Sequence, residues 1–294
     1  MTKISKKLIR NYKRLKLNKI INLSEAKLAK EKIAKIQAGL KKKLEIRTDP
    51  SFKLYTLLQN TMSYFAEEIS VQDDFIEYYD QVVEVEDDYM PSFPPGSPLT
   101  GSYFTYWAFC DLQFGKHKET INTILSDIGE VFGFDEIVMK GLANLDKSCM
   151  RFYKHMGFED DLILLKDLLT DKVYPTLCAS GYRGKKDEIW YIRIVPNLDK
   201  IYDYSISLTT PYVIINYKEQ AWLDFFQRQG IKKGEKDFEK KYSKFMKHPS
   251  DFKYWHDYIM DGYSNYKPNC IYLTGIPDIK GSKPHELGTD FNPF

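Results

Sequence analysis

Cysteine is scarce in this 294-residue chain, and its four copies are not spaced for chemistry. Cys110, Cys149, Cys178 and Cys270 lie far apart and form no C-x-x-C pair. Disulfide frameworks and zinc sites both depend on closely spaced ligands, so we expect buried, reduced thiols and a cytoplasmic location. No uncharged apolar run approaches the roughly 20 residues that a bilayer-spanning helix needs, which predicts no membrane association.

The signatures of common catalytic sites are also missing. The sequence contains no G-x-x-x-x-G-K-[ST] loop, and its five histidines form neither an H-x-x-x-H pair nor an H-E-x-x-H motif. Phosphate loops and zinc hydrolases require these spacings. The sequence therefore indicates no catalytic residue, no metal ligand and no cofactor, and it favours a non-catalytic protein over an enzyme.

Positive charge is absent from one long stretch and concentrated in another. Residues 54–115 contain no Lys or Arg and eleven Asp or Glu, whereas residues 1–47 carry sixteen Lys and Arg against three Glu. The two stretches nearly cancel, so the whole chain has a formal net charge of only +2. A concentrated basic arm attracts polyanions and acidic protein surfaces, which makes this arm the main functional feature of the sequence.

The basic arm supplies the principal candidate binding residues. They are Lys3, Lys6, Lys7, Arg10, Lys13, Arg14, Lys16 and Lys19. Three interpretations stay open at this point. The arm binds nucleic acid, it docks on an acidic protein surface, or it neutralises the acidic 54–115 stretch, either in its own chain or in a second copy. Contacts to phosphates would make the binding weaken steeply with salt.

A second group of cations lies in a short glycine-containing segment. Residues 180–186 read Ser-Gly-Tyr-Arg-Gly-Lys-Lys, so Arg183, Lys185 and Lys186 stand between two expected strands. The glycines free the backbone, and such a loop can cradle a phosphate or grip a nucleic-acid backbone. A plain basic hairpin loop is the favoured alternative, because the segment lacks the phosphate-loop pattern and does not open a helix.

The acidic stretch raises the question of a metal site. Its carboxylates include Glu67, Glu68, Asp73, Asp74, Glu77 and Asp80, and hard cations such as Mg²⁺ prefer oxygen ligands of this type. A metal-dependent enzyme acting on nucleic acid or a nucleotide is therefore an alternative function, with Asp73, Asp74 and Glu77 as the residues to test. The stretch contains no lysine to complete such a site, which favours a solvated acidic surface.

The apolar periods predict an α+β fold with four regions. Residues 1–50 form a basic helical arm, in which a helix over 24–46 has the apolar seam Ala29, Ile33, Ile36, Leu40 and Leu44. Residues 51–158 are mainly helical and contain the acidic stretch and a proline-rich loop. Residues 159–217 form an antiparallel β unit, and residues 218–294 are helical and pack on it.

Within these regions the patterns place individual elements. Helical spacing predicts helices over 54–69, over 121–132 with a stop at Gly133, and over 138–156 with a stop at Gly157. The aromatic segment 103–114 resembles a nucleotide-stacking platform in composition, but a buried helix is favoured. Strand-like runs at 162–165, 173–178, 189–195, 205–208 and 212–215 predict an antiparallel meander or small barrel over about 160–216.

For function, these observations predict a non-catalytic cytoplasmic interaction protein that is a subunit of a larger assembly. Its basic arm and the Arg183–Lys186 segment would bind nucleic acid or an acidic protein surface. Two alternatives remain: the metal-dependent enzyme, and a head-to-tail homo-oligomer in which the arm of one copy lies on the acidic stretch of another and loosens at high salt.

Overall fold

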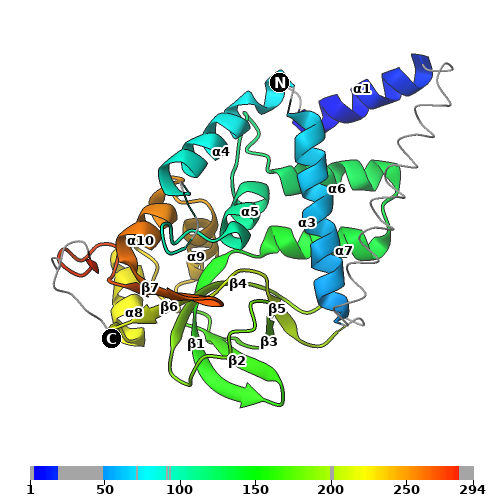
Figure 1. The fold of residues 1–294 in the computed structure, drawn as a ribbon. Helices are drawn as coiled ribbons and strands as arrows, with labels where there is room; N and C mark the ends of the chain where they lie inside the picture. The colour runs from blue at the N-terminus through cyan, green and yellow to red at the C-terminus, as the bar shows by residue number, and fades with distance from the viewer. Residues whose placement is uncertain are drawn as a thin grey trace. The chain divides into compact units, whose positions relative to one another are not determined.

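The computed structural model describes residues 3–18, 49–70, 72–90, 92, 94–198 and 202–284. The chain divides into two compact units, whose helices and strands are labelled in Figure 1. Unit 1 consists of Met1–Glu77 and Phe114–Ala143, and unit 2 consists of Tyr78–Gln113 and Asn144–Phe294. Helices occur in both units and a mixed sheet in unit 2, so the predicted α+β class is confirmed.

Unit 1 is helical within the described residues. It contains α1 (Ile4–Asn18), α3 (Pro50–Ile69), the short 3-10 helix η1 (Asp73–Phe75), α6 (Ile121–Phe132) and most of α7 (Glu136–Lys147). The helices predicted over 54–69 and 121–132 are therefore confirmed. The helix predicted over 24–46 lies outside the described residues.

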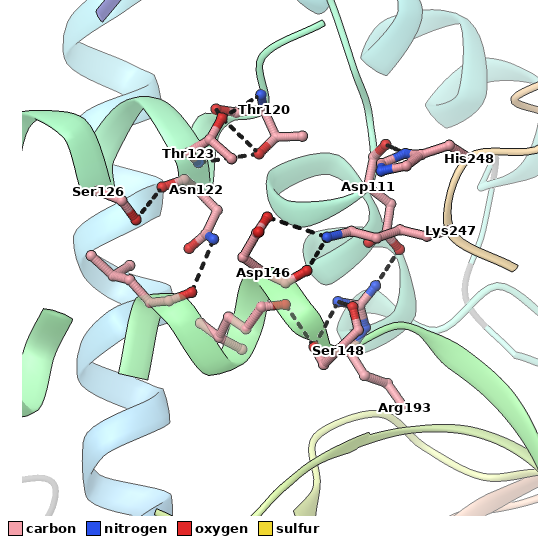
Figure 2. A network of polar contacts seen from close by, with 12 residues as sticks. Asp111, Thr120, Asn122, Thr123, Ser126, Asp146, Ser148, Arg193, Lys247 and His248 are labelled. Carbon is pink, nitrogen blue, oxygen red and sulfur yellow. Dashed lines mark hydrogen bonds and ion pairs between the residues drawn. The ribbon is translucent and has the colours of Figure 1, made fainter. Parts of the chain in front are cut away.

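Local capping chemistry explains where α3 and α6 begin and end. The Asp49 carboxylate accepts hydrogen bonds from the backbone N–H groups of Ser51 and Phe52, with a proline in the first turn of α3. Thr120 and Thr123 form a reciprocal capping box at the start of α6. Gly133 ends α6 in the left-handed conformation, with a φ of 71°. Figure 2 shows the capping box and the neighbouring Asn122. The Asn122 amide donates a hydrogen bond to the Leu142 carbonyl at 3.1 Å.

Unit 2 combines helices with the sheet. Its helices are α4 (Ile76–Tyr89, beginning two residues before the unit boundary), α5 (Gly101–Cys110), α8 (Glu219–Arg228), α9 (Phe238–Lys247) and α10 (Tyr254–Gly262). Tyr103, Tyr106, Trp107 and Phe109 of α5 are buried, so this aromatic segment is a core helix and not an exposed stacking platform. None of the helices in the described ranges has both the length and the apolarity needed to cross a membrane.

Eight strands lie in the described part of unit 2. They are β1 (Met150–Glu159), β2 (Leu162–Asp167), β3 (Val173–Cys178), β4 (Ile189–Val195), β5 (Ser205–Ser207), β6 (Tyr212–Ile215), β7 (Tyr263–Lys267) and β8 (Cys270–Thr274). Strands β2 to β6 match the five runs predicted from the sequence. The sequence did not predict β1 or β7.

The sheet is mixed, and the antiparallel meander or barrel expected over 160–216 is not confirmed. The strand order is β1-β2-β3-β5-β4-β6-β8-β7, with an additional pairing between β1 and β4. The β3–β5 and β6–β8 pairs are parallel. β1 joins from a segment that was expected to be helical, and β7 and β8 join from beyond residue 216. The local pattern identified strand-forming runs, whereas their partners come from distant parts of the chain.

The helix predicted over 138–156 is wrong beyond Lys147. Residues from Met150 onward form β1, whose backbone pairs with β2 and with β4. Phe152 stacks on Trp222 of α8 at 3.9 Å, while the neighbouring Tyr153 belongs to the cluster on the opposite side of the sheet. Gly157, expected to stop a helix, instead follows a register shift in β1 with a φ of 118°.

Both faces of β4 are covered, and all seven of its residues are buried. Trp190, Ile192 and Ile194 join one apolar cluster with residues of β1 and β2. Tyr191 faces the other way and packs against Trp255 of α10. A continuous apolar run is typical of a strand buried on both sides. The one charged residue in that run, Arg193, therefore requires a buried partner.

Candidate nucleic-acid interface

The first turn of α1 is anchored to unit 1 by a buried carboxylate. Glu119 accepts hydrogen bonds from the backbone N–H of Ile4 (2.8 Å) and from the hydroxyl of Ser5 (3.1 Å). Glu119 is itself held by two backbone hydrogen bonds to Phe114, and its residue is only 4% exposed. A carboxylate here satisfies N–H groups that a helix leaves unpaired and complements the helix dipole. The orientation of α1 in unit 1 is thereby set.

Two cations of the predicted binding set are used within unit 1. Lys7 forms an ion pair with Asp74 at 2.7 Å, and Lys3 lies 3.6 Å from Asp127 of α6. All four side chains are more than a third exposed, so each pair contributes little to stability. For these two residues the structure shows neutralisation by acids of the same chain, and one of those acids, Asp74, belongs to the acidic 54–115 stretch.

The remaining described cations of α1 form one exposed face. Lys6, Arg10, Lys13 and Arg14 are all exposed. Their positions repeat at i, i+4, i+7 and i+8, which places them on one side of an α-helix. Within the ranges that the structure describes, none of the four has an ion pair or a hydrogen-bonded side chain. We call these four residues the cationic face of α1.

The other two cations predicted in the arm cannot be placed on this face. Lys16 belongs to the last part of α1, but its side chain lies outside the described part of the structure, as does the whole of Lys19. The cationic face is therefore defined by four residues, half of the eight named from the sequence.

The Arg183–Lys186 segment is an ordered loop in unit 2. The Arg183 guanidinium lies over the Phe158 ring, 4.6 Å from its centroid, and donates a hydrogen bond to the Asp161 carbonyl at 3.1 Å. Lys185 and Lys186 are exposed, with no ion pair inside the described ranges. The loop therefore brings the three predicted cations together next to the turn between β1 and β2.

His155 fixes the backbone of this loop. The residue is fully buried, and its Nε2 lies 3.0 Å from the Arg183 carbonyl while its Nδ1 accepts from the Gly157 N–H at 3.0 Å. Only a neutral ring with its proton on Nε2 satisfies both bonds. Burial lowers the pKa of His155, with the Arg183 carbonyl partly opposing this effect. The loop is thus held by a histidine that stays neutral at pH 7.

A second set of contacts packs the loop against the side chains of Glu188 and Trp190. The Glu188 carboxylate accepts hydrogen bonds from Trp190 Nε1 at 2.9 Å and from the Tyr182 hydroxyl at 3.2 Å. Gly184, with a φ of 64°, passes so close that an added Cβ would lie 2.3 Å from Trp190 Cζ2. The loop is therefore packed against buried side chains.

The acids proposed for a metal site are not gathered into one. Asp74 is paired with Lys7, and Glu77 accepts a hydrogen bond from the Gly115 N–H at 2.9 Å. Across the ranges that the structure describes, no group of three or more His, Cys, Asp or Glu side chains could hold a metal ion. The geometry therefore offers no support for the metal-dependent alternative.

Figure 2 shows a partly buried polar network in unit 2 that sequence reasoning missed. Arg193 pairs with Asp111 and donates to the Ser148 hydroxyl at 3.2 Å. The Asp111 carbonyl accepts from His248 Nδ1 at 2.9 Å, and the neighbouring Lys247 binds the carbonyl and carboxylate of Asp146. A signal existed: Arg193 is the one charged residue in the apolar run of β4, and a buried cation requires an acid.

This network holds elements together and offers no reactive group. Burial raises the pKa of the adjacent Cys110 thiol to about 12, which excludes a thiolate nucleophile at neutral pH. Burial likewise lowers the pKa of His248, and its Nδ1 is occupied by the Asp111 carbonyl. We therefore assign the network a structural role at the junction of α5, α9 and β4.

Comparisons with known proteins add no assignment. Neither a protein-family model, nor a curated protein, nor a solved structure matches the chain. A function can therefore be argued only from the residues themselves.

Proposed function

We propose that this chain is a non-catalytic nucleic-acid-binding protein, and a subunit of a larger assembly, whose α1 contacts the phosphate backbone. One observation supports this most directly. Lys6, Arg10, Lys13 and Arg14 share one exposed helix face and have no acidic partner within the described ranges. Exposed cations in this arrangement neutralise phosphates and release counterions, which is the main source of sequence-independent affinity.

The anchoring of α1 strengthens the argument. The Glu119 carboxylate holds the first turn, and Lys3 and Lys7 are occupied by acids of unit 1. The four cations of the face are therefore displayed on a helix that is already folded and attached, so its backbone does not need to be ordered on binding, which lowers the entropic cost of association. An acidic protein surface could use the same face, and we treat it as an outcome of the test.

The test compares two variants of equal charge change in the full chain. The first variant, K6Q/R10Q/K13Q/R14Q, removes the cationic face. The second, K232Q/K236Q/K240Q/K244Q, removes four lysines of unit 2 that have no ion pair in the described ranges. Binding of fluorescently labelled single-stranded DNA, RNA and duplex DNA is measured by anisotropy between about 50 and 300 mM salt, where phosphate contacts dominate the salt dependence.

We expect the first variant to reduce the slope of log K against log salt by about 3, since each phosphate contact contributes about 0.7 to 0.9. The control variant should change the slope by less than about 1. An equal reduction of the salt slope in the two variants would contradict the assignment of the phosphate contacts to α1. Binding to a labelled polyglutamate peptide, with none to DNA or RNA, would replace nucleic acid by an acidic protein surface.

Self-association is measured on the same samples. Sedimentation at low and high salt reports whether copies bind one another through the charged stretches. A dimer that dissociates with salt and is lost in K6Q/R10Q/K13Q/R14Q, without nucleic-acid binding, would instead support the head-to-tail homo-oligomer.

A further inference from the structure

Arg183 and Phe158 contact each other at a partly exposed position on unit 2. The guanidinium carbon lies 4.6 Å from the ring centroid, and the Arg183 side chain is 52% exposed while Phe158 is 45% exposed. A guanidinium is planar, and planar cations resting on an aromatic ring also stack on nucleobases. The side of Arg183 that does not face Phe158 is thus a surface on which an unpaired base can stack.

This surface is held in place before any ligand arrives. The Arg183 side chain is fixed by the Asp161 carbonyl at 3.1 Å, and its backbone by His155 at 3.0 Å. The following Gly184 is packed against Trp190. A side chain whose backbone and terminal group are both held loses little freedom on binding, so stacking energy is retained as affinity.

The charges around Arg183 decide what kind of contact it makes. Lys185 and Lys186 are exposed on the same loop, but Glu159, Asp160 and Asp161 are exposed on the adjoining turn. Asp187 is paired with Lys154 at 3.3 Å, and Glu188 is bonded to Trp190. Arg183 itself lies 3.9 Å from the Asp161 carboxylate. Because the acids of the turn balance the cations of the loop, stacking and not net charge is the main interaction this surface offers.

We propose that the Arg183–Phe158 surface stacks one base of a single-stranded nucleic acid, with Lys185 or Lys186 on a neighbouring phosphate. Bases in a duplex are already stacked and paired, so only a single strand presents a free base face. This inference rests on the proposed function for the class of ligand, but it uses a different part of the chain and a different interaction from the cationic face of α1.

The experiment separates stacking from charge. Arg183→Lys keeps the charge but removes the plane, and Arg228→Lys is the matched control, because Arg228 is an exposed arginine paired with Asp278. Each full-length variant is titrated by anisotropy against a labelled oligothymidylate and against an oligonucleotide of equal length in which the central bases are replaced by abasic sites.

We expect Arg183→Lys to weaken oligothymidylate binding by about fivefold or more at every salt concentration, with an unchanged salt slope and little effect on the abasic strand. Phe158→Leu, which removes the ring beneath the guanidinium, should act in the same direction. Lys185→Gln/Lys186→Gln should instead reduce the salt slope by about 1. The thermal midpoint of each variant confirms that unit 2 is folded.

Several results would overturn the proposal. Wild-type affinity in Arg183→Lys would do so, as would an equal loss on the abasic strand or a loss seen only on polyglutamate. The proposed function is contradicted separately if K6Q/R10Q/K13Q/R14Q binds nucleic acid as its control variant does. In that case Arg183→Lys would still lose the part of the affinity that depends on the bases.

Discussion

Arg193 of β4 and Asp111, the residue that caps the end of α5, form an ion pair whose side chains are 1% and 6% exposed. Arg193 also donates to the Ser148 hydroxyl, and its backbone N–H donates to Thr209 at 3.0 Å. The second Asp111 oxygen and Arg193 Nε have no hydrogen-bond partner in the described ranges. The pair therefore joins a helix end to the centre of the sheet at a high desolvation cost.

Removing one member of this pair should destabilise unit 2 strongly. Arg193→Met leaves a buried carboxylate without its cation, and Asp111→Asn leaves a buried cation, so we expect each to lower the free energy of unfolding by about 3 to 5 kcal/mol. The double variant should lose clearly less free energy of unfolding than the two single variants lose together, because it leaves no unpaired charge in the interior. All four tryptophans belong to unit 2, so urea unfolding followed by tryptophan fluorescence measures the effect there.

The exposed Arg228–Asp278 pair provides the control for that measurement. Its two side chains are 45% and 25% exposed, and Asp278→Asn should cost less than about 1 kcal/mol. If the loss of free energy of unfolding in the double variant equals the sum of the losses in the Arg193 and Asp111 single variants, the two side chains act independently.

Gly181 and Gly184 should differ in their tolerance of alanine. Both have positive φ, 75° and 64°, so a Cβ costs about 1 kcal/mol at either position. An added Cβ meets nothing within 4 Å at Gly181, whereas at Gly184 it would lie 2.3 Å from Trp190. We expect Gly184→Ala to be less stable than Gly181→Ala by about 1 to 3 kcal/mol, the usual cost of overpacking. Thermal or urea unfolding compares them, and equal midpoints would mean that the loop moves freely from Trp190.

His256 should make unit 2 less stable in acid. Burial, with a smaller effect of the Lys253 charge, lowers the pKa of His256 to about 3. The unfolded residue titrates near 6.5, so below that pH the unfolded chain binds more protons. The contribution of His256 is constant above about pH 6.5 and falls by about 1.4 kcal/mol per pH unit as the pH drops toward 3. Burial also lowers the pKa of His155 and His248, so their effects have the same sign.

The measurement is urea unfolding at pH 7.5, 6.0 and 5.0 for the wild type and His256→Gln. The glutamine does not titrate, so the stability gap between the two proteins should narrow by about 2 kcal/mol between pH 7.5 and pH 5.0. Replacing the exposed His117 with Gln controls for the loss of a histidine side chain. If the free energy of unfolding changes with pH in parallel for wild type and His256→Gln, the pKa of His256 is not lowered in the folded protein.

Elements with purely local causes were predictable from the sequence. The capping residues and apolar spacing of α6, including its stop at Gly133, are encoded within about 14 consecutive positions. The runs that form β2 to β6 were recognised by their branched and aromatic residues. β1 was missed because Cys149, Phe152 and Met156 also satisfy a helical spacing. What makes the segment a strand is its backbone pairing with β4, about 40 residues further along the chain.

The candidate surfaces divide in the same way. The cations of the arm and the loop are visible in the sequence, because charge and short spacing are properties of neighbouring residues. The pairing of Lys7 with Asp74, and the position of Arg183 over Phe158, join residues 67 and 25 positions apart. Such contacts depend on chain reversals that no local pattern specifies.

The amino-acid sequence by itself determined the α+β composition, most helix and strand positions, and which cations are available. Tertiary structure alone decided that the sheet is mixed, that Asp111 is the buried partner of Arg193, and that only four of the described α1 cations face solvent without an acid. The physical reason is that propensity and capping act over a few residues. Desolvation, strand pairing and the exposure of a charge depend instead on which distant segments pack together.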